Sequence, residues 1–167
     1  MAEYRTDSVM VASHIPLLVR VFDLSTGPVL ELGTGYFSTQ LLHWLATVAK
    51  RPVYSYESRG SWFRRAQHWK NEYHHIRFCE RWEDADLTEH FWGMAFVDHA
   101  PNLRRPIDIQ RLHNQAQLIV IHDTEPAWDA QYGYSAIWPL FQYRYDYTKI
   151  YPSTTVVSNF QDLSDVR

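Results

Sequence analysis

Five short apolar runs constrain the fold of this chain more than any other feature. They fall at residues 28–32, 53–56, 75–79, 93–97 and 117–121. Between them lie segments whose apolar residues recur every three or four positions, as on one face of a helix, at residues 8–22, 37–50, 61–73 and 103–114. Short apolar strands that alternate with helices predict a parallel sheet covered by helices on both faces.

The last third of the chain predicts a different local pairing. After a short helix at residues 136–141, the segments 145–151 and 154–158 are expected to form two strands joined by Pro152 and Ser153, which favours a hairpin. The predicted fold class is therefore α/β: a three-layer Rossmann-like sandwich with a mostly parallel sheet and a C-terminal antiparallel hairpin. Because the 167 residues show no repeat and no linker, we expect residues 1–167 to form a single domain.

Local features also predict how individual helices begin and pack. Pro16 lies inside the first helical pattern and predicts a kink or two short helices there. Leu42, Leu45 and Val48 share one face of the segment 37–50, which we expect to be buried. Ser61 is placed to cap the helix over residues 61–73.

Composition excludes several classes of protein. With 46% apolar and 21% charged residues, the chain is not of the disordered type. A net charge of −3 without a basic stripe argues against nucleic-acid binding by charge alone. No run approaches the roughly 18 apolar residues of a membrane span. Met1 to Asp7 carry both charge signs and no apolar run, so we expect no signal peptide there. The single cysteine, Cys79, fits a reducing compartment, so we expect a cytoplasmic protein.

The segment after the first strand predicts a ligand-binding turn. Gly33 and Gly35 permit close approach of a ligand to the backbone, and the following helix offers free N–H groups. The third glycine of a dinucleotide fingerprint is absent and Ser38 stands in its place, which argues against a pyrophosphate but not against a smaller ligand. The alternative is a tight strand–helix connection that binds nothing.

Acidic and aromatic residues follow the next two strands. Glu57, 22 residues beyond Gly35, is placed to accept both hydroxyls of a ribose; otherwise it is a surface residue paired with Arg59. Trp82 and Glu83 follow the third strand and suit an adenine ring, which Trp82 would stack against and Glu83 would hydrogen-bond. They equally suit a packed indole beside an acidic capping turn.

Two Asp–His pairs follow the fourth and fifth strands. Asp98 and His99 end one strand, and His122 and Asp123 end the next, so we expect the four side chains to converge. A carboxylate beside an imidazole suits a general base near neutral pH. Asp98, Asp123 and Thr124 also suit a divalent cation, and a purely structural role for all of them stays open.

Together these residues resemble the class I S-adenosylmethionine-dependent methyltransferases. The segment Val29-Leu30-Glu31-Leu32-Gly33-Thr34-Gly35 is similar to that family's first motif, Glu57 matches its acidic residue after the second strand, and Val120-Ile121-His122-Asp123-Thr124 resembles the end of the fifth strand in a bacterial small-molecule subgroup. The resemblance implies S-adenosylmethionine as cofactor, bound by Glu31, Gly33, Gly35, Tyr36, Ser38, Glu57, Trp82, Glu83 and Asp98. It also implies that His99, His122 or Asp123 removes the acceptor's proton.

Two substitutions separate the chain from the metal-dependent members of that family. Thr124 stands where those enzymes have an Asn ligand, and Pro101 stands at the position of their catalytic Lys. We therefore expect no metal. The carboxylates of Asp98 and Asp123 should instead be neutralised by His99, His122, Arg104 or the charges of the cofactor.

The function that these residues predict is methyl transfer to an oxygen or nitrogen of a small molecule. The alternatives are an NAD-binding oxidoreductase and a catalytically degenerate methyltransferase fold that acts as a binding module. A small-molecule acceptor is the expected partner, with neither nucleic acid nor membrane involved. Because the chain is short, its substrate site is open, small or completed by a partner, and a homo-oligomer stays open.

Overall fold

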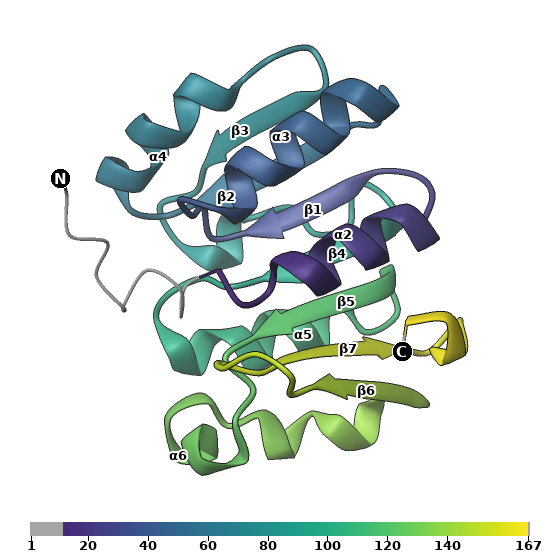
Figure 1. The fold of residues 1–167 in the computed structure, drawn as a ribbon. Helices are drawn as coiled ribbons and strands as arrows, with labels where there is room; N and C mark the ends of the chain where they lie inside the picture. Colours follow the sequence, from purple (N-terminus) through teal and green to yellow (C-terminus); the bar gives the residue numbers. More distant parts are fainter. Residues whose placement is uncertain (1–11, 167) are drawn as a thin grey trace, which may run out of the picture.

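A seven-stranded sheet forms the centre of the computed structural model, which describes residues 12–166 (Figure 1). The strands are β1 (Val29–Leu32), β2 (Val53–Glu57), β3 (His74–Phe78), β4 (Trp92–Val97), β5 (Ala116–His122), β6 (Tyr143–Tyr147) and β7 (Thr154–Ser158). Their order in the sheet is β3-β2-β1-β4-β5-β7-β6. Strands β1 to β5 pair in parallel, and β7 runs antiparallel to both β5 and β6. The predicted fold class is thus confirmed.

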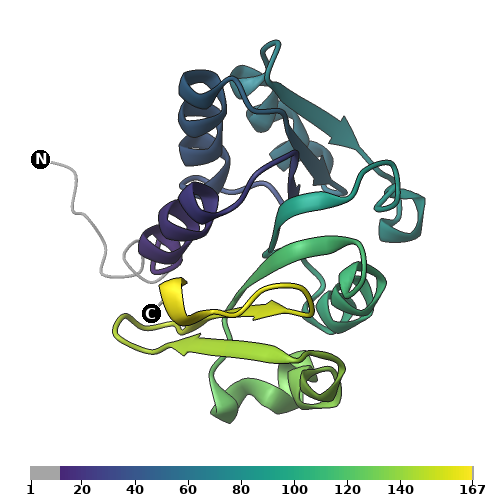
Figure 2. The same cartoon turned by 90° about the vertical axis from the view of Figure 1, so that its right-hand side faces the viewer.

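Helices cover both faces of this sheet (Figure 2). They are α2 (Ile15–Leu24), α3 (Ser38–Ala49), α4 (Gly60–Ala66), α5 (Arg105–Leu112) and α6 (Asp129–Tyr132). Helices α2 and α3 pack on one face, and α5 and α6 on the other. Helix α4 packs against β2 and β3 near one edge of the sheet. Among residues 12–166, we find no helix with the length and apolarity needed to cross a bilayer.

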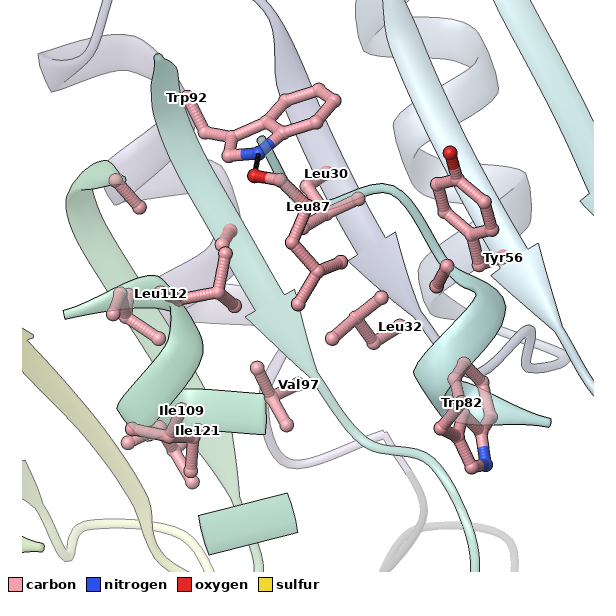
Figure 3. Packing of buried hydrophobic residues seen from close by; sticks show 14 of the residues in the cluster. Leu30, Leu32, Tyr56, Trp82, Leu87, Trp92, Val97, Ile109, Leu112 and Ile121 are labelled. Atoms are coloured by element: carbon pink, nitrogen blue, oxygen red, sulfur yellow. Dashed lines mark hydrogen bonds between the residues drawn. The ribbon is translucent and has the colours of Figure 1, made fainter. Parts of the chain in front are cut away.

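The two faces of the sheet carry separate apolar cores because strand side chains alternate in direction. Leu30 and Leu32 face α5, together with the indole of Trp92, whose Nε1 donates to the carbonyl of Leu87 at 2.8 Å (Figure 3). Val29 faces α2 and α3 instead. Each such buried side chain contributes about 1.5–3 kcal/mol. The polar Glu31, two positions beyond Val29, is thereby directed into the α3 side.

Helix α2 begins where the sequence predicts a kink. Pro16 occupies the first turn of α2, where a missing N–H leaves no hydrogen bond unmade. Pro16 therefore produces no kink within α2. The alternative of two short helices depends on residues 8–11, which lie outside the described residues.

Three other helix predictions are wrong in detail. Leu42 and Ala46 provide the buried face of α3, whereas Val48 is 84% exposed. Helix α4 begins at Gly60, so Ser61 is not its cap, and it passes into a 3₁₀ turn at residues 67–69. The segment 136–141 forms 3₁₀ turns (Tyr134–Ala136 and Trp138–Leu140) rather than a helix, and Pro139 supplies no backbone donor there.

Candidate functional site

A cavity of about 330 Å³ opens at the carboxyl ends of β1, β2 and β4. Four segments line it: residues 33–38 after β1, Glu57, Arg59 and Trp62 after β2, residues 98–100 after β4, and His14 ahead of α2. Six of the residues predicted to bind a cofactor are among them: Gly33, Gly35, Tyr36, Ser38, Glu57 and Asp98. The structure therefore brings together residues from four separate parts of the chain.

Gly33 forms the floor of this cavity. Its φ is +91°, and a Cβ there would lie 2.6 Å from the Cα of His99, so no side chain fits. Gly35 has an ordinary φ, and a Cβ there would meet only the Ser38 Oγ, at 3.0 Å. The first glycine is thus required by the fold, while the second leaves space on the cavity side.

Glu31 lies beneath the loop rather than among the cavity-lining residues of 12–166. Its buried carboxylate accepts hydrogen bonds from the hydroxyls of Ser55 and Thr39, and the Thr39 hydroxyl accepts the N–H of Gly35 at 2.9 Å. Burial raises the pKa of Glu31 to about 7, although the hydroxyl donors oppose the rise. Through Thr39, Glu31 therefore holds the glycine loop in place.

Glu57 faces the cavity with both carboxylate oxygens already hydrogen-bonded. One oxygen accepts from the N–H and hydroxyl of Thr34, both at 2.9 Å, and the other from the N–H groups of Ser58 and Arg59, both at 2.8 Å. These four donors fill the usual capacity of a carboxylate. A ligand hydroxyl that binds Glu57 would therefore replace or share the hydroxyl of Thr34.

Trp82 and Glu83 are not among the cavity-lining residues of the described chain. The Trp82 indole is buried, donates to the carbonyl of Ala100 at 2.8 Å and packs 4.2 Å from the ring of His99. Glu83 lies at the surface and pairs with Arg104. Trp82 thus supports the segment after β4 from behind.

Arg105 lies between the two carboxylates that were expected to converge. Its guanidinium is 2.9 Å from Asp98 Oδ1 and 3.1 Å from Asp123 Oδ2. The sequence pointed to Arg104 as one candidate for this cation. The structure instead pairs Arg104 with Asp108, because these residues are four apart on one helical face. The Arg105 charge compensates both carboxylates.

His122 contributes a second positive charge to this cluster. Its Nδ1 lies 3.3 Å from Asp98 and 3.4 Å from Asp123, and its Nε2 lies 2.9 Å from the Ser13 hydroxyl. That hydroxyl donates to the carbonyl of Pro152 at 2.7 Å, so it accepts from His122. Burial is the largest influence and opposes the charged imidazolium, but Asp98 and Asp123 together hold the pKa of His122 above its ordinary value.

The predicted catalytic residues fall into two groups. His99 belongs to the cavity lining, but its Nε2 bonds to the buried Asp108 at 3.0 Å, and burial lowers its pKa. Asp123, with φ +59°, accepts from the Tyr132 hydroxyl at 2.9 Å. Within residues 12–166, neither His122 nor Asp123 lines the cavity. These two residues lie behind Asp98 and form a charge cluster with Arg105.

Sequence reasoning missed His14 and the role of Arg105. His14 precedes α2 and has no neighbouring motif, so nothing in its local sequence marks it. Arg105 carried a usable signal, since it opens the helix directly after β4. His14, Asp98 and His122 each place one metal-binding atom within 4.8 Å of the others. Two of the three are already ion-paired to each other, and Asp98 also to Arg105.

The solved structures to which this chain is similar include methyltransferases. The human methyltransferase 10 domain containing protein matches with a TM-score of 0.63 and 12% identity, over 90% of this chain and 84% of that one. An O-methyltransferase from Bacillus cereus in complex with SAH matches at 0.62 and 15%, over 85% and 78%. TomG, an O-methyltransferase from Streptomyces achromogenes in complex with SAM, matches at 0.63 and 16%, over 87% and 78%.

By sequence, no protein-family model and no curated protein matches the chain. The structural likeness nevertheless shows the fold. This chain has the fold of the class I S-adenosylmethionine-dependent methyltransferases.

Proposed function

We propose that this chain binds S-adenosylmethionine in the 330 Å³ cavity and transfers its methyl group to an oxygen or nitrogen of a small molecule. One observation carries the proposal: the glycine loop, Glu57 and Asp98 come together in a single cavity at the carboxyl edge of the sheet. The structural neighbours include O-methyltransferases solved with SAM or SAH.

The residues of the cavity fit this cofactor. Gly33 leaves a floor of bare backbone for the methionine part. Glu57 would accept hydrogen bonds from the ribose hydroxyls once the Thr34 hydroxyl no longer donates to it. Asp98 would offer a negative charge to the amino group of the cofactor's methionine part. When bound, the cofactor supplies a methyl group already activated on a sulfonium, so the protein's main task is alignment.

Titration calorimetry with S-adenosylhomocysteine, S-adenosylmethionine and NAD tests the proposal. We expect the two sulfur compounds to bind and NAD to fail, because Ser38 replaces the third glycine of a dinucleotide site. Tight binding of NAD alone would point to an oxidoreductase. Cofactor binding without transfer to any acceptor would leave a binding module.

Glu57→Ala provides the residue-level test. Charge-assisted hydrogen bonds contribute about 1.5–3 kcal/mol each, so we expect S-adenosylhomocysteine affinity to fall at least about tenfold. Glu57→Gln, which keeps an acceptor for the N–H groups of Ser58 and Arg59, guards against misfolding. Glu72→Ala, at an exposed acid, is the matched control. Unchanged affinity in folded Glu57→Ala would remove Glu57 from the ribose site.

A further inference from the structure

His14 lines the cavity with an imidazole that forms no internal hydrogen bond. The residue is 1% exposed, and neither Nδ1 nor Nε2 has a partner among the residues described. Buried polar atoms without partners cost free energy, so such an orphaned ring calls for an explanation. A ligand group bound in the cavity would satisfy it.

The neighbours of His14 already satisfy one another. The ring packs 4.9 Å from Phe96 and edge-on to His122 at 4.8 Å. Asp98 faces it from the end of β4 and His122 from the end of β5, with Arg105 paired to Asp98 behind them. Because those charges are mutually compensated, Asp98 and His122 are already engaged, whereas both ring nitrogens of His14 are free for a ligand; the other unpartnered ring nitrogen of the described lining is His99 Nδ1.

The surroundings also fix the protonation state of His14. Burial lowers its pKa to about 4, the positive His122 adds to the effect, and Asp98 opposes it. A neutral imidazole keeps one nitrogen lone pair, which can accept a hydrogen bond and then a proton. His122 lacks that lone pair, since it donates from both nitrogens.

His99 is the competing imidazole in the cavity wall. Its side chain is fully enclosed between Asp108 and the Trp82 ring, and the part that meets Gly33 is backbone. The geometry therefore favours His14.

We propose that His14 is the catalytic residue that accepts the proton of the methyl acceptor, an inference that rests on the proposed function. The acceptor is then a protic nucleophile, a phenol, alcohol or amine that enters uncharged. Its O–H or N–H bond breaks and the proton goes to His14. The acceptor's electron pair forms the new bond to the methyl carbon, and the pair of the methyl–sulfur bond stays on sulfur.

This step conserves charge beside Asp98. The positive charge of the sulfonium disappears as the imidazolium of His14 forms, so the net charge of the site stays the same through the transfer, with Arg105 and His122 still paired to Asp98. The proton leaves to solvent when the product departs.

NMR of histidine-labelled protein tests the resting state, with His14→Gln used to assign the signal among nine histidines. We expect His14 to be neutral at pH 7, to protonate only below about pH 5, and to shift on saturation with S-adenosylhomocysteine. A charged His14 at pH 7 would overturn the proposal, and so would a His14 signal whose chemical shift does not change on saturation with S-adenosylhomocysteine. Calorimetry separates the two hypotheses, because wild-type protein that binds no S-adenosylhomocysteine refutes the proposed function itself.

Turnover tests the chemical role. Formation of S-adenosylhomocysteine from S-adenosylmethionine is followed with a panel of phenols, alcohols and primary amines. We expect His14→Ala to retain S-adenosylhomocysteine affinity within about twofold and to lose at least about 100-fold in transfer, with partial rescue by added imidazole. His113→Ala, at a half-buried histidine that is not among the cavity-lining residues, should match wild type. Methyl transfer at the wild-type rate by His14→Ala would contradict the assignment of His14 as proton acceptor. The assignment would also fail if His99→Ala alone lost transfer and regained it with added imidazole.

Discussion

At the scale of single residues, Glu31 shows how strand geometry corrects a motif-based prediction. The motif suggested contact with the cofactor, but Glu31 alternates in direction with Leu30 and Leu32 and so points into the layer under α3. There it meets Thr39, which holds the N–H of Gly35. A sequence motif identifies the loop that binds, whereas the strand register decides which of its residues touch the ligand.

This burial predicts a pH-dependent stability. The folded-state pKa of Glu31 is about 7, raised by burial from an ordinary 4.5. A raised carboxyl pKa means that the folded state holds the proton of Glu31 more tightly than the unfolded state does. The stability that this proton contributes is therefore fully present below pH 4.5 and is lost as the pH rises towards 7. We expect Glu31→Gln to gain up to about 3 kcal/mol over wild type between pH 4.5 and pH 8, measured by urea unfolding. Glu72→Gln is the control. Parallel pH curves for Glu31→Gln and wild type would refute the effect.

At the scale of elements, the parallel strands were predictable and the helix faces were less so. The strand expected at residues 145–151 instead lies at Tyr143–Tyr147. Apolar runs place β1, β2, β4 and β5 to within about a residue, since a strand buried on both faces is mostly apolar. The face of α3 was not fixed by spacing, because Val48 fits the same helical pattern as Leu42 yet points to solvent. Which face is buried depends on where the sheet lies, and that is non-local information.

Substitutions of the two glycines in the β1–α3 loop should have different effects: at Gly33 on stability, and at Gly35 on ligand binding. Gly33→Ala places a Cβ 2.6 Å from His99 Cα at a positive φ, so we expect a loss of about 2–3 kcal/mol in unfolding free energy. Gly27→Ala, also at a positive φ but in open space, should cost about 1 kcal/mol. Gly35→Val should stay folded and lose S-adenosylhomocysteine binding. Urea unfolding measures the change in stability, and calorimetry measures the affinity for S-adenosylhomocysteine. Normal binding by Gly35→Val would show that the loop only connects β1 to α3 and does not contact the ligand.

At the scale of the whole molecule, the sheet order assembles the site. Strands β4 and β5 pair in parallel, so Asp98 and His122 meet at one edge, as the sequence predicts. His14 joins them from the start of α2, far along the chain, and no local pattern indicates that contact. Convergence between neighbouring strands could therefore be predicted, but a contribution from a distant helix could not.

The charge balance of this assembled cluster leads to the last prediction. Two carboxylates this close are costly unless a cation lies between them, and Arg105 fills that place for Asp98 and Asp123. Wild-type binding of S-adenosylmethionine should therefore survive EDTA and gain nothing from magnesium.

Arg105→Met removes the cation, and we expect a loss of about 3–5 kcal/mol in unfolding free energy, typical of a broken buried ion pair. Magnesium should restore part of that loss in the variant, because the two carboxylates are then free to bind it. Arg144→Met, at a more exposed ion pair, should change stability by no more than about 1 kcal/mol. Urea unfolding and calorimetry with and without EDTA or magnesium decide the matter. Magnesium-dependent turnover in wild type, lost in both Asp98→Ala and Asp123→Ala, would establish a metal mechanism in its place.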